Sequence, residues 1–177
     1  MKMVVFESDG IDARTKEDLR ELWNRAFGHQ FSGDDADHAF GGVHVLMRDG
    51  ARLVGHASAV TRRVRFGDGP WCDVGYVEAV ATDPKRQGEG IGRCIMQRLR
   101  SEIAMRWPIA MLSTGRATLF YEALGWERWR GASYVQTAQG VAPANEHGGL
   151  MILRLDPLTV PDLTLSVTCE DRNGDPW

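Results

Sequence analysis

The hydrophobic residues of this chain fall into short runs of two different periods. Runs rich in β-branched residues, which are typical of strands, occupy residues 3–6, 43–47, 53–66 and 71–81. Asp49 and Gly50 form a strong hairpin signal between the second and third runs, and glycine and proline residues within 67–70 mark the next turn. The first half of the chain therefore predicts an antiparallel meander.

Apolar residues at helical spacing predict three helices. The first has Thr15 as its N-cap and Gly28 as its end, and its apolar face contains Leu19, Leu22, Trp23 and Phe27. The second begins near Ile91, with Ile91, Cys94, Ile95 and Leu99 on its apolar side. The third spans 116–124 and ends at Gly125, with Leu119, Phe120 and Ala123 on one side.

The second half of the chain predicts further strands at 108–113, 127–130, 134–137 and 150–155, with a polar loop at 139–149. Before the meander, residues 28–42 form an acidic stretch flanked by glycine. Two interpretations of this stretch remain open. It is a solvated loop or helix start with acidic caps, or it is an electronegative wall for a polyamine substrate.

The centre of the pattern is a strand that leads through a glycine-rich loop into a helix. Gly88, Gly90 and Gly92 let the backbone approach a ligand closely, since they carry no Cβ. The N–H groups at the start of the following helix have no intrahelical partner, and the helix dipole favours negative charge there. Lys85, Arg86 and Arg93 add positive charge, so this unit predicts a phosphate site; glycines alone also fit a turn without ligand.

Two common phosphate-binding motifs do not fit this loop. The Walker motif needs Lys and then Ser or Thr after its last glycine, whereas Gly92 is followed by Arg93 and Cys94. The dinucleotide fingerprint needs the spacing G-x-G-x-x-G, whereas the spacing here is G-x-G-x-G.

The segment Gln87-Gly88-Glu89-Gly90-Ile91-Gly92 resembles motif A of the GNAT superfamily of acetyl-CoA-dependent N-acetyltransferases, as does its lead-in Val80-Ala81-Thr82-Asp83-Pro84. The resemblance implies an α/β (α+β) fold in which helices flank a mixed, mostly antiparallel sheet with splayed central strands. It also implies acetyl-CoA as co-substrate, with its pyrophosphate on the loop amides and its acetyl carbonyl held by backbone near Val80. The implied cofactor-binding residues are Val80, Ala81, Arg86, Gln87, Gly88, Gly90, Ile91, Gly92 and Arg93.

A second stretch, residues 117–126, resembles GNAT motif B, whose signature is Tyr-x-x-x-Gly-Phe/Trp. Tyr121 occupies the position where the superfamily places a general acid, which would protonate the leaving CoA thiolate. The alternative for Tyr121 is a core tyrosine with a satisfied hydroxyl. The two motifs stand in the expected order, about thirty residues apart, which strengthens the assignment.

A narrower resemblance, to the aminoglycoside 2′-N-acetyltransferases, covers nearly the whole chain. It rests on 27–46, on 75–81, on Ser113 with Tyr121, and on the ending Gly174-Asp175-Pro176-Trp177. The resemblance implies antibiotic resistance as the role, and a substrate pocket that contains Gln30, Asp35, Glu78, Ser113, Asp175 and Trp177. Gln30 and the Asn145-Glu146 pair stand where the family has aspartates, so an acceptor with fewer amines, such as kasugamycin, becomes a candidate beside gentamicin or tobramycin.

Glu78 is the predicted general base. An acceptor amine is protonated near neutral pH and must lose a proton before it attacks, which a carboxylate can accept directly or through water. Glu78 lies in an apolar strand, where an unpaired charge is costly unless it faces a polar cavity. The alternative is a salt-bridged strand residue. The resemblance implies that the carboxylate of Trp177 shares the role of base, in a direct transfer without a covalent enzyme intermediate.

Composition limits the number of domains, the class of partner and the chemistry of the cysteines. The chain has 177 residues, 43% hydrophobic and 25% charged, which predicts one domain over residues 1–177. A net charge of −3 gives no sign of a nucleic-acid partner. Cys72, Cys94 and Cys169 match no metal pattern, so we expect reduced thiols, no metal and a cytoplasmic protein without signal peptide or membrane span. The resemblance implies that a homodimer is common in the family.

Two rival functions remain open from the sequence. One is a GNAT enzyme that acts on a peptide amino terminus or a small metabolic amine. The other is a regulatory module that binds CoA without turnover, for which the carboxylate of Glu78 would be dispensable.

Overall fold

The computed structural model describes residues 1–28, 31–144, 146, 148–156 and 161–177. Its contacts divide the chain into two compact units. Unit 1 comprises Met1–Val60 and Val77–Ile103, and unit 2 comprises Thr61–Tyr76 and Ala104–Trp177. Two long strands, β3 (Arg52–Phe66) and β4 (Trp71–Thr82), contribute residues to both units.

Unit 1 is built on antiparallel strands that follow the predicted meander. Besides its parts of β3 and β4, it contains β1 (Lys2–Glu7), η1 (Ser8–Gly10), α1 (Ala13–Phe27), α2 (Gly33–His38), β2 (Gly42–Asp49), η3 (Pro84–Arg86) and α3 (Ile91–Ala104) up to Ile103. β2 pairs with β1 on one side and with β3 on the other, both antiparallel. Gly50, at φ 59°, makes the hairpin turn between β2 and β3, as the sequence predicts.

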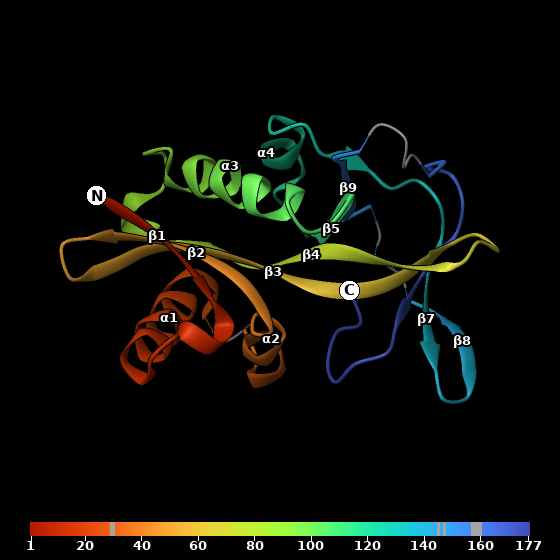
Figure 1. Cartoon of the computed structure of the whole chain (residues 1–177), viewed down its shortest axis with the longest axis horizontal. Helices are drawn as coiled ribbons and strands as arrows, with labels where there is room; N and C mark the ends of the chain where they lie inside the picture. The colour runs from red at the N-terminus through yellow and green to blue at the C-terminus, as the bar shows by residue number, and fades with distance from the viewer. Residues whose placement is uncertain (29–30, 145, 147, 157–160) are drawn as a thin grey trace. The chain divides into compact units, whose positions relative to one another are not determined.

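Helices α1 and α3 lie on opposite faces of the unit 1 strands (Figure 1). Leu19, Leu22 and Trp23 of α1 are fully buried in a core that includes Leu46 of β2. On the other face α3 packs closely against β3, because a Cβ at Gly55 would lie 2.5 Å from Cδ1 of Ile95. The glycine loop between β4 and α3 is thus anchored by a helix that packs directly on the sheet.

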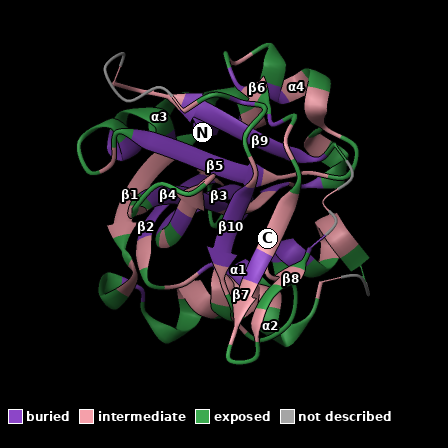
Figure 2. Ribbon diagram, turned by 90° about the vertical axis from the view of Figure 1, so that its right-hand side faces the viewer, coloured by how far each residue is buried: buried purple, intermediate pink, exposed green. Residues whose placement is uncertain are grey.

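Unit 2 contains the remaining strands and one short helix. These are β5 (Ile109–Ser113), α4 (Thr118–Glu122), β6 (Glu127–Arg128), β7 (Ser133–Thr137), β8 (Gly140–Pro143), β9 (Leu150–Arg154) and β10 (Val167–Glu170). The strand order is β6-β9-β5-β4-β3-β10-β7-β8. β5 and β9 are buried along most of their length (Figure 2).

The expected fold class is confirmed: helices flank a mixed sheet in which most pairs are antiparallel. Among the described pairs, the parallel ones are β4 with β5 and β10 with β7. The β4–β5 pairing covers only Gly75↔Ala110 and Tyr76↔Met111. None of the described helices is long and apolar enough to cross a membrane.

Two details of the predicted long helices are wrong. The N-cap of α1 is Asp12, whose carboxylate accepts a 2.7 Å hydrogen bond from the backbone N–H of Thr15, so the helix begins two residues before Thr15. Cys94 is exposed, whereas Ile91, Ile95 and Leu99 of α3 are buried as expected. Met96, on the other flank of this face, is buried instead.

The motif B helix also differs from its prediction. α4 has five residues, and Leu119 is 75% exposed while Ala123 is also exposed. The buried residue of this helix is Tyr121, whose ring lies edge-on to Trp126 at a centroid distance of 6.0 Å. The helix therefore packs through Tyr121 rather than through the aliphatic side that the spacing indicated.

Sequence patterns missed two strands of unit 2. β8 lies within the predicted polar loop and forms a hairpin with β7, from Tyr134↔Pro143 to Thr137↔Gly140. β10 lies in the tail, where it pairs antiparallel with β3 and parallel with β7. Both strands have four residues, which is too short for a clear period in the sequence.

Candidate active site

The loop between β4 and α3 has the geometry of an anion cradle. Gly88 and Gly90 have φ values of 84° and 79°, a left-handed conformation that L-residues with a Cβ rarely adopt. A Cβ at either glycine would meet nothing within 4 Å, so the space above the loop is open. The helix start that follows presents N–H groups without intrahelical acceptors. Gln87, Ile91, Gly92 and Arg93 complete this loop and first turn, so the segment fits a diphosphate.

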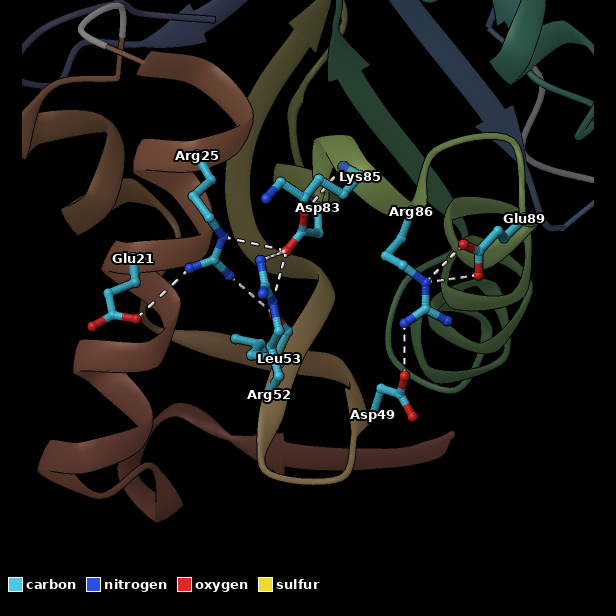
Figure 3. Close-up of polar contacts among 9 residues, drawn as sticks. All are labelled: Glu21, Arg25, Asp49, Arg52, Leu53, Asp83, Lys85, Arg86 and Glu89. Carbon is cyan, nitrogen blue, oxygen red and sulfur yellow. Dashed lines mark hydrogen bonds and ion pairs between the residues drawn. The ribbon is translucent and has the colours of Figure 1, made fainter.

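Arg86 ties this loop to the β2–β3 hairpin (Figure 3). Its Nε donates to both oxygens of Glu89 at 2.7 and 2.8 Å, and its Nη1 donates to Asp49 at 2.7 Å. The hydrogen bonds that Arg86 donates to Glu89 and Asp49 raise its pKa above the ordinary value. The guanidinium thereby neutralises Glu89 beside the cradle, while its predicted contact with the cofactor stays a prediction.

Asp83 anchors the end of β4 through contacts with Arg25, Arg52 and Lys85 (Figure 3). Its side chain is 1% exposed and accepts from Arg52 Nη2 at 2.6 Å, with Arg25 Nε at 3.3 Å. It also accepts from the N–H of Lys85 at 3.1 Å and so caps η3. Burial by itself raises the pKa of this carboxyl, but the bonds from Lys85 and Arg52 and the charge of Arg25 outweigh it, and the pKa is lowered.

We expect Asp83→Asn to lower the free energy of unfolding at pH 7 by about 2 kcal/mol, since hydrogen bonds to charged groups contribute ~1.5–3 kcal/mol. Because the folded-state pKa lies below the unfolded value, the ionised carboxyl stabilises the protein above that value, and this stabilisation is lost as pH falls through the folded pKa. Urea unfolding at pH 7 and below pH 4 measures both effects. The exposed turn residue Asp68 gives the control, Asp68→Asn; an equal loss there would contradict the assignment.

β4 carries the predicted base and the predicted acetyl-binding backbone. Glu78 is half-buried, between Val77, which is 4% exposed, and Ala79. Ala79 has a φ of 51° and is the one residue other than glycine with positive φ in the described chain. The carbonyl of Glu78 is 3.4 Å from the Oγ of Ser58, and that of Ala79 is 2.9 Å from Nδ1 of His56. Side chains of β3 thus contact two successive carbonyls just before Val80 and Ala81.

Unit 2 contains the predicted site residues Ser113, Tyr121, Asp175 and Trp177. Ser113, at the end of β5, donates a short hydrogen bond to Oε2 of Glu146. The N–H of Glu146 in turn bonds to Ser133 of β7 at 3.2 Å. The structure therefore brings a carboxylate to Ser113 that the sequence analysis did not count among the site residues.

The tail is folded against β3, β4 and β10 within unit 2. Trp177 is 5% exposed, and its backbone N–H donates to exposed Asp175 at 3.0 Å. Arg62 donates to the carbonyl of Pro176 at 2.9 Å, and its guanidinium lies 5.5 Å from the ring centre of Tyr76. The indole Nε1 of Trp177 is buried without a hydrogen-bond partner among the described residues. The predicted pair Asp175 and Trp177 is thus in direct contact.

Tyr121 is 6% exposed, and burial raises the pKa of its hydroxyl above the ordinary value. A tyrosine in this state keeps its proton at neutral pH, as a general acid requires, and the same is true of a core tyrosine. Its catalytic role therefore stays a prediction.

The acidic stretch before β2 contains a capped helix. Asp35 Oδ2 accepts from the backbone N–H of Ser32 at 2.7 Å and from its hydroxyl at 2.9 Å, in the capping box of α2. The observed helix start with acidic caps is one of the two interpretations that the sequence left open. Gln30, a predicted substrate residue, lies outside the described residues.

Two buried histidines of unit 1 were not assigned a role from the sequence. His44 and His56 are both fully buried, and His44 Nδ1 lies 3.1 Å from His56 Nε2. The β2–β3 register pairs His44 with Ser58 and Leu46 with His56, which makes the histidines diagonal neighbours on one face. Counting back from the Asp49-Gly50 turn would not have found this pair, because the β2–β3 register shifts by one residue between Met47 and Arg48. Among the described residues, no group of three or more His, Cys, Asp and Glu is placed to hold a metal ion.

Comparisons with known proteins place the chain in a family of acetyltransferases, in agreement with the glycine loop between β4 and α3. A family model described as an acetyltransferase (GNAT) domain matches residues 10–129. The chain is 33% identical over 181 aligned residues to an aminoglycoside 2′-N-acetyltransferase from Mycolicibacterium fortuitum, covering 98% of this chain and 90% of that protein.

Two solved structures illustrate the fold. A GNAT family acetyltransferase from Brucella melitensis, in complex with acetyl-CoA, matches with a TM-score of 0.63 and 15% identity, covering 94% of each chain. A GCN5-related N-acetyltransferase from Kribbella flavida matches 72% of this chain with a TM-score of 0.57 and 20% identity. This chain spans 34% of the length of that protein.

Proposed function

Because the chain belongs to the GNAT acetyltransferase family, we propose that it transfers the acetyl group of acetyl-CoA to the 2′-amine of an aminoglycoside. The family consists of acetyl-CoA-dependent N-acetyltransferases. The observation that carries the finer proposal is the 33% identity to an aminoglycoside 2′-N-acetyltransferase over 98% of the chain. The open, left-handed glycine turn at Gly88 and Gly90 supports the donor part of the proposal.

In this proposal each candidate residue carries out one step of the acetyl transfer. The amides that follow Gln87 bind the pyrophosphate, and the loop glycines leave room for it. Glu78 accepts the proton of the acceptor ammonium, directly or through water, and the amine then attacks the thioester. The N–H of Val80 donates to the thioester oxygen as negative charge develops there. Tyr121 protonates the departing thiolate.

The acceptor is proposed from acidic and polar groups of the chain. Asp35, Ser113, Asp175 and Trp177 are the candidates, with Glu146 added through its bond to Ser113. A hydrogen bond between such a carboxylate and an ammonium contributes about 1.5–3 kcal/mol when shielded from water. Kasugamycin is proposed beside 2-deoxystreptamine drugs because the chain has fewer carboxylates than the family pattern.

A panel of amines tests this function. Purified protein is mixed with acetyl-CoA and with kasugamycin, gentamicin, tobramycin or a short peptide, and the release of CoA thiol is followed. We expect turnover with at least one aminoglycoside, and mass spectrometry should find one acetyl group on its 2′-amine. Turnover of the peptide alone would favour a peptide acetyltransferase. Binding of acetyl-CoA without turnover of any amine would favour a regulatory module.

A further inference from the structure

A continuous row of polar groups crosses unit 1 from half-buried Ser8 of η1 to β4. Ser8 Oγ lies 2.7 Å from His44 Nε2, and His44 Nδ1 lies 3.1 Å from His56 Nε2. His56 Nδ1 then lies 2.9 Å from the carbonyl oxygen of Ala79. Both histidines are fully buried. The row ends on the backbone next to Val80, the proposed donor to the thioester oxygen.

The hydrogen-bond inventory decides the direction of this row. The N–H groups of Gly41 and Gly42 donate to Ser8 Oγ at 2.8 and 3.0 Å and fill its two lone pairs. The single proton of the Ser8 hydroxyl has two acceptors within reach, His44 Nε2 at 2.7 Å and the carbonyl oxygen of Gly42 at 3.0 Å, and we assign it to the shorter contact, His44. Since each neutral imidazole carries one N–H, His44 Nδ1 then donates to His56 Nε2. His56 Nδ1 is left with the proton, which it donates to the carbonyl of Ala79.

The opposite direction leaves worse contacts. Trp23 Nε1 lies 3.2 Å from His56 Nδ1 and could donate to it if that nitrogen carried no proton. The carbonyl oxygen of Ala79 would then face a lone pair at 2.9 Å. Ser8 Oγ would also have to accept a third hydrogen bond, from His44. The first direction gives up the contact of Trp23 with His56 at 3.2 Å and that of the Ser8 hydroxyl with the Gly42 carbonyl at 3.0 Å, and it keeps the shorter contacts at 2.7 and 2.9 Å.

Both rings are neutral in the folded protein, as a directional row requires. Burial lowers the pKa of His44 to about 4. Burial and the charge of His44 lower the pKa of His56 to about 3, against the raising effect of its bond to Ala79.

Because the peptide group is planar, the contact of His56 with the Ala79 carbonyl also sets the direction of the Val80 N–H. The Ala79–Val80 peptide is trans, so its N–H points away from its carbonyl. A bond that fixes the Ala79 carbonyl therefore also fixes the direction of the Val80 N–H. This matters because Ala79 has a φ of 51°, a strained conformation for an alanine that persists only when neighbouring groups hold it.

We propose that Ser8, His44 and His56 form a relay of positioning residues that aims the Val80 N–H at the thioester oxygen. The relay rests on the proposed role of Val80 in acetyl transfer. Its residues touch neither substrate, and they act through the Ala79–Val80 peptide.

Three variants separate this role from general damage to the core. His56→Leu removes the donor to Ala79, and we expect kcat to fall about tenfold or more, part of the 10²–10³ that loss of an oxyanion donor costs. KM for acetyl-CoA should stay within about threefold, because the loop is untouched. His56→Asn places an amide N–H near the position of Nδ1 and should restore kcat to within about threefold of wild type. Trp23→Phe should lower Tm but keep kcat within about twofold, since its indole N–H is not part of the relay.

Equal losses of kcat in Trp23→Phe and His56→Leu would overturn the proposal, as would a wild-type kcat in His56→Leu. Nitrogen-15 NMR of the histidine rings in the unmodified protein gives a second test that needs no variant. The relay predicts protonated Nδ1 and unprotonated Nε2 in both His44 and His56. A proton on Nε2 of His56 would refute it. Absence of acetyl transfer in the wild-type protein would defeat the proposed function instead, while the NMR result would still decide the tautomers.

Discussion

Replacement of Glu78 by Gln is expected to lower kcat about 100- to 10,000-fold, the usual contribution of a positioned general base. The amide has nearly the same shape but accepts no proton at neutral pH, so the acceptor stays an ammonium that cannot attack. Glu78 is half-buried on β4, one residue before Ala79, so the change leaves the glycine loop intact. KM for acetyl-CoA should therefore stay within about threefold of wild type.

Steady-state kinetics with the best aminoglycoside of the panel measures this effect. Glu21→Gln is the matched control, because Glu21 is an exposed carboxylate of α1 that pairs with Arg25 at 3.7 Å. It should retain wild-type kcat. A Glu78→Gln variant with full kcat would remove Glu78 from the mechanism and would favour the salt-bridged alternative.

The second large effect is expected on the binding of acetyl-CoA at the glycine loop between β4 and α3. Gly90→Ala should raise KM for acetyl-CoA about tenfold or more, since every tenfold corresponds to about 1.4 kcal/mol. Two causes add: an alanine is strained at φ 79°, and its methyl group would occupy the open space above the loop. The value of kcat at saturating acetyl-CoA should change much less.

Gly140→Ala is the control for backbone strain outside the glycine loop. Gly140 has a φ of 123° in the β7–β8 hairpin of unit 2, and a Cβ there also meets nothing within 4 Å. This control shares the backbone strain but lies in the other unit, so we expect lower stability with an unchanged KM. A Gly90→Ala variant that binds acetyl-CoA as tightly as wild type, measured by calorimetry, would refute the assignment of the cradle.

The parts of the fold that the sequence predicts are those with a strong local cause. The loop at Gly88 and Gly90 was predictable because only glycine suits its left-handed turns, and the β2–β3 hairpin because Asp49-Gly50 specifies its turn. The strands β8 and β10 were missed because four residues give too little periodicity, and pairing with β7 stabilises both.

The candidate site shows the same division. Motif residues identify Gln87 and Tyr121 by local spacing, whereas partners that come from distant segments are set by packing. Glu146 meets Ser113 across 33 positions of the chain, and Ser8 meets His44 across 36. The sequence predicts Asp35 as a substrate residue and leaves a helix cap as the alternative, and the bonds of Asp35 to Ser32 are those of a cap. Such pairings depend on the register of strands and on loop closure, which no local pattern encodes.

The left-handed backbone of Ala79 restricts which amino acids evolution can place in the middle of β4. Valine or isoleucine, favoured at most strand positions, would be severely strained at a φ of 51°. Asparagine or aspartate tolerates that conformation, but residue 79 packs against the apolar core that contains Leu19 and Leu46. Glycine would fit, at the expense of a more disordered unfolded chain. Alanine therefore combines tolerable strain at this φ with an apolar side chain that suits the core. The left-handed backbone thus explains why a small residue interrupts this valine-rich strand.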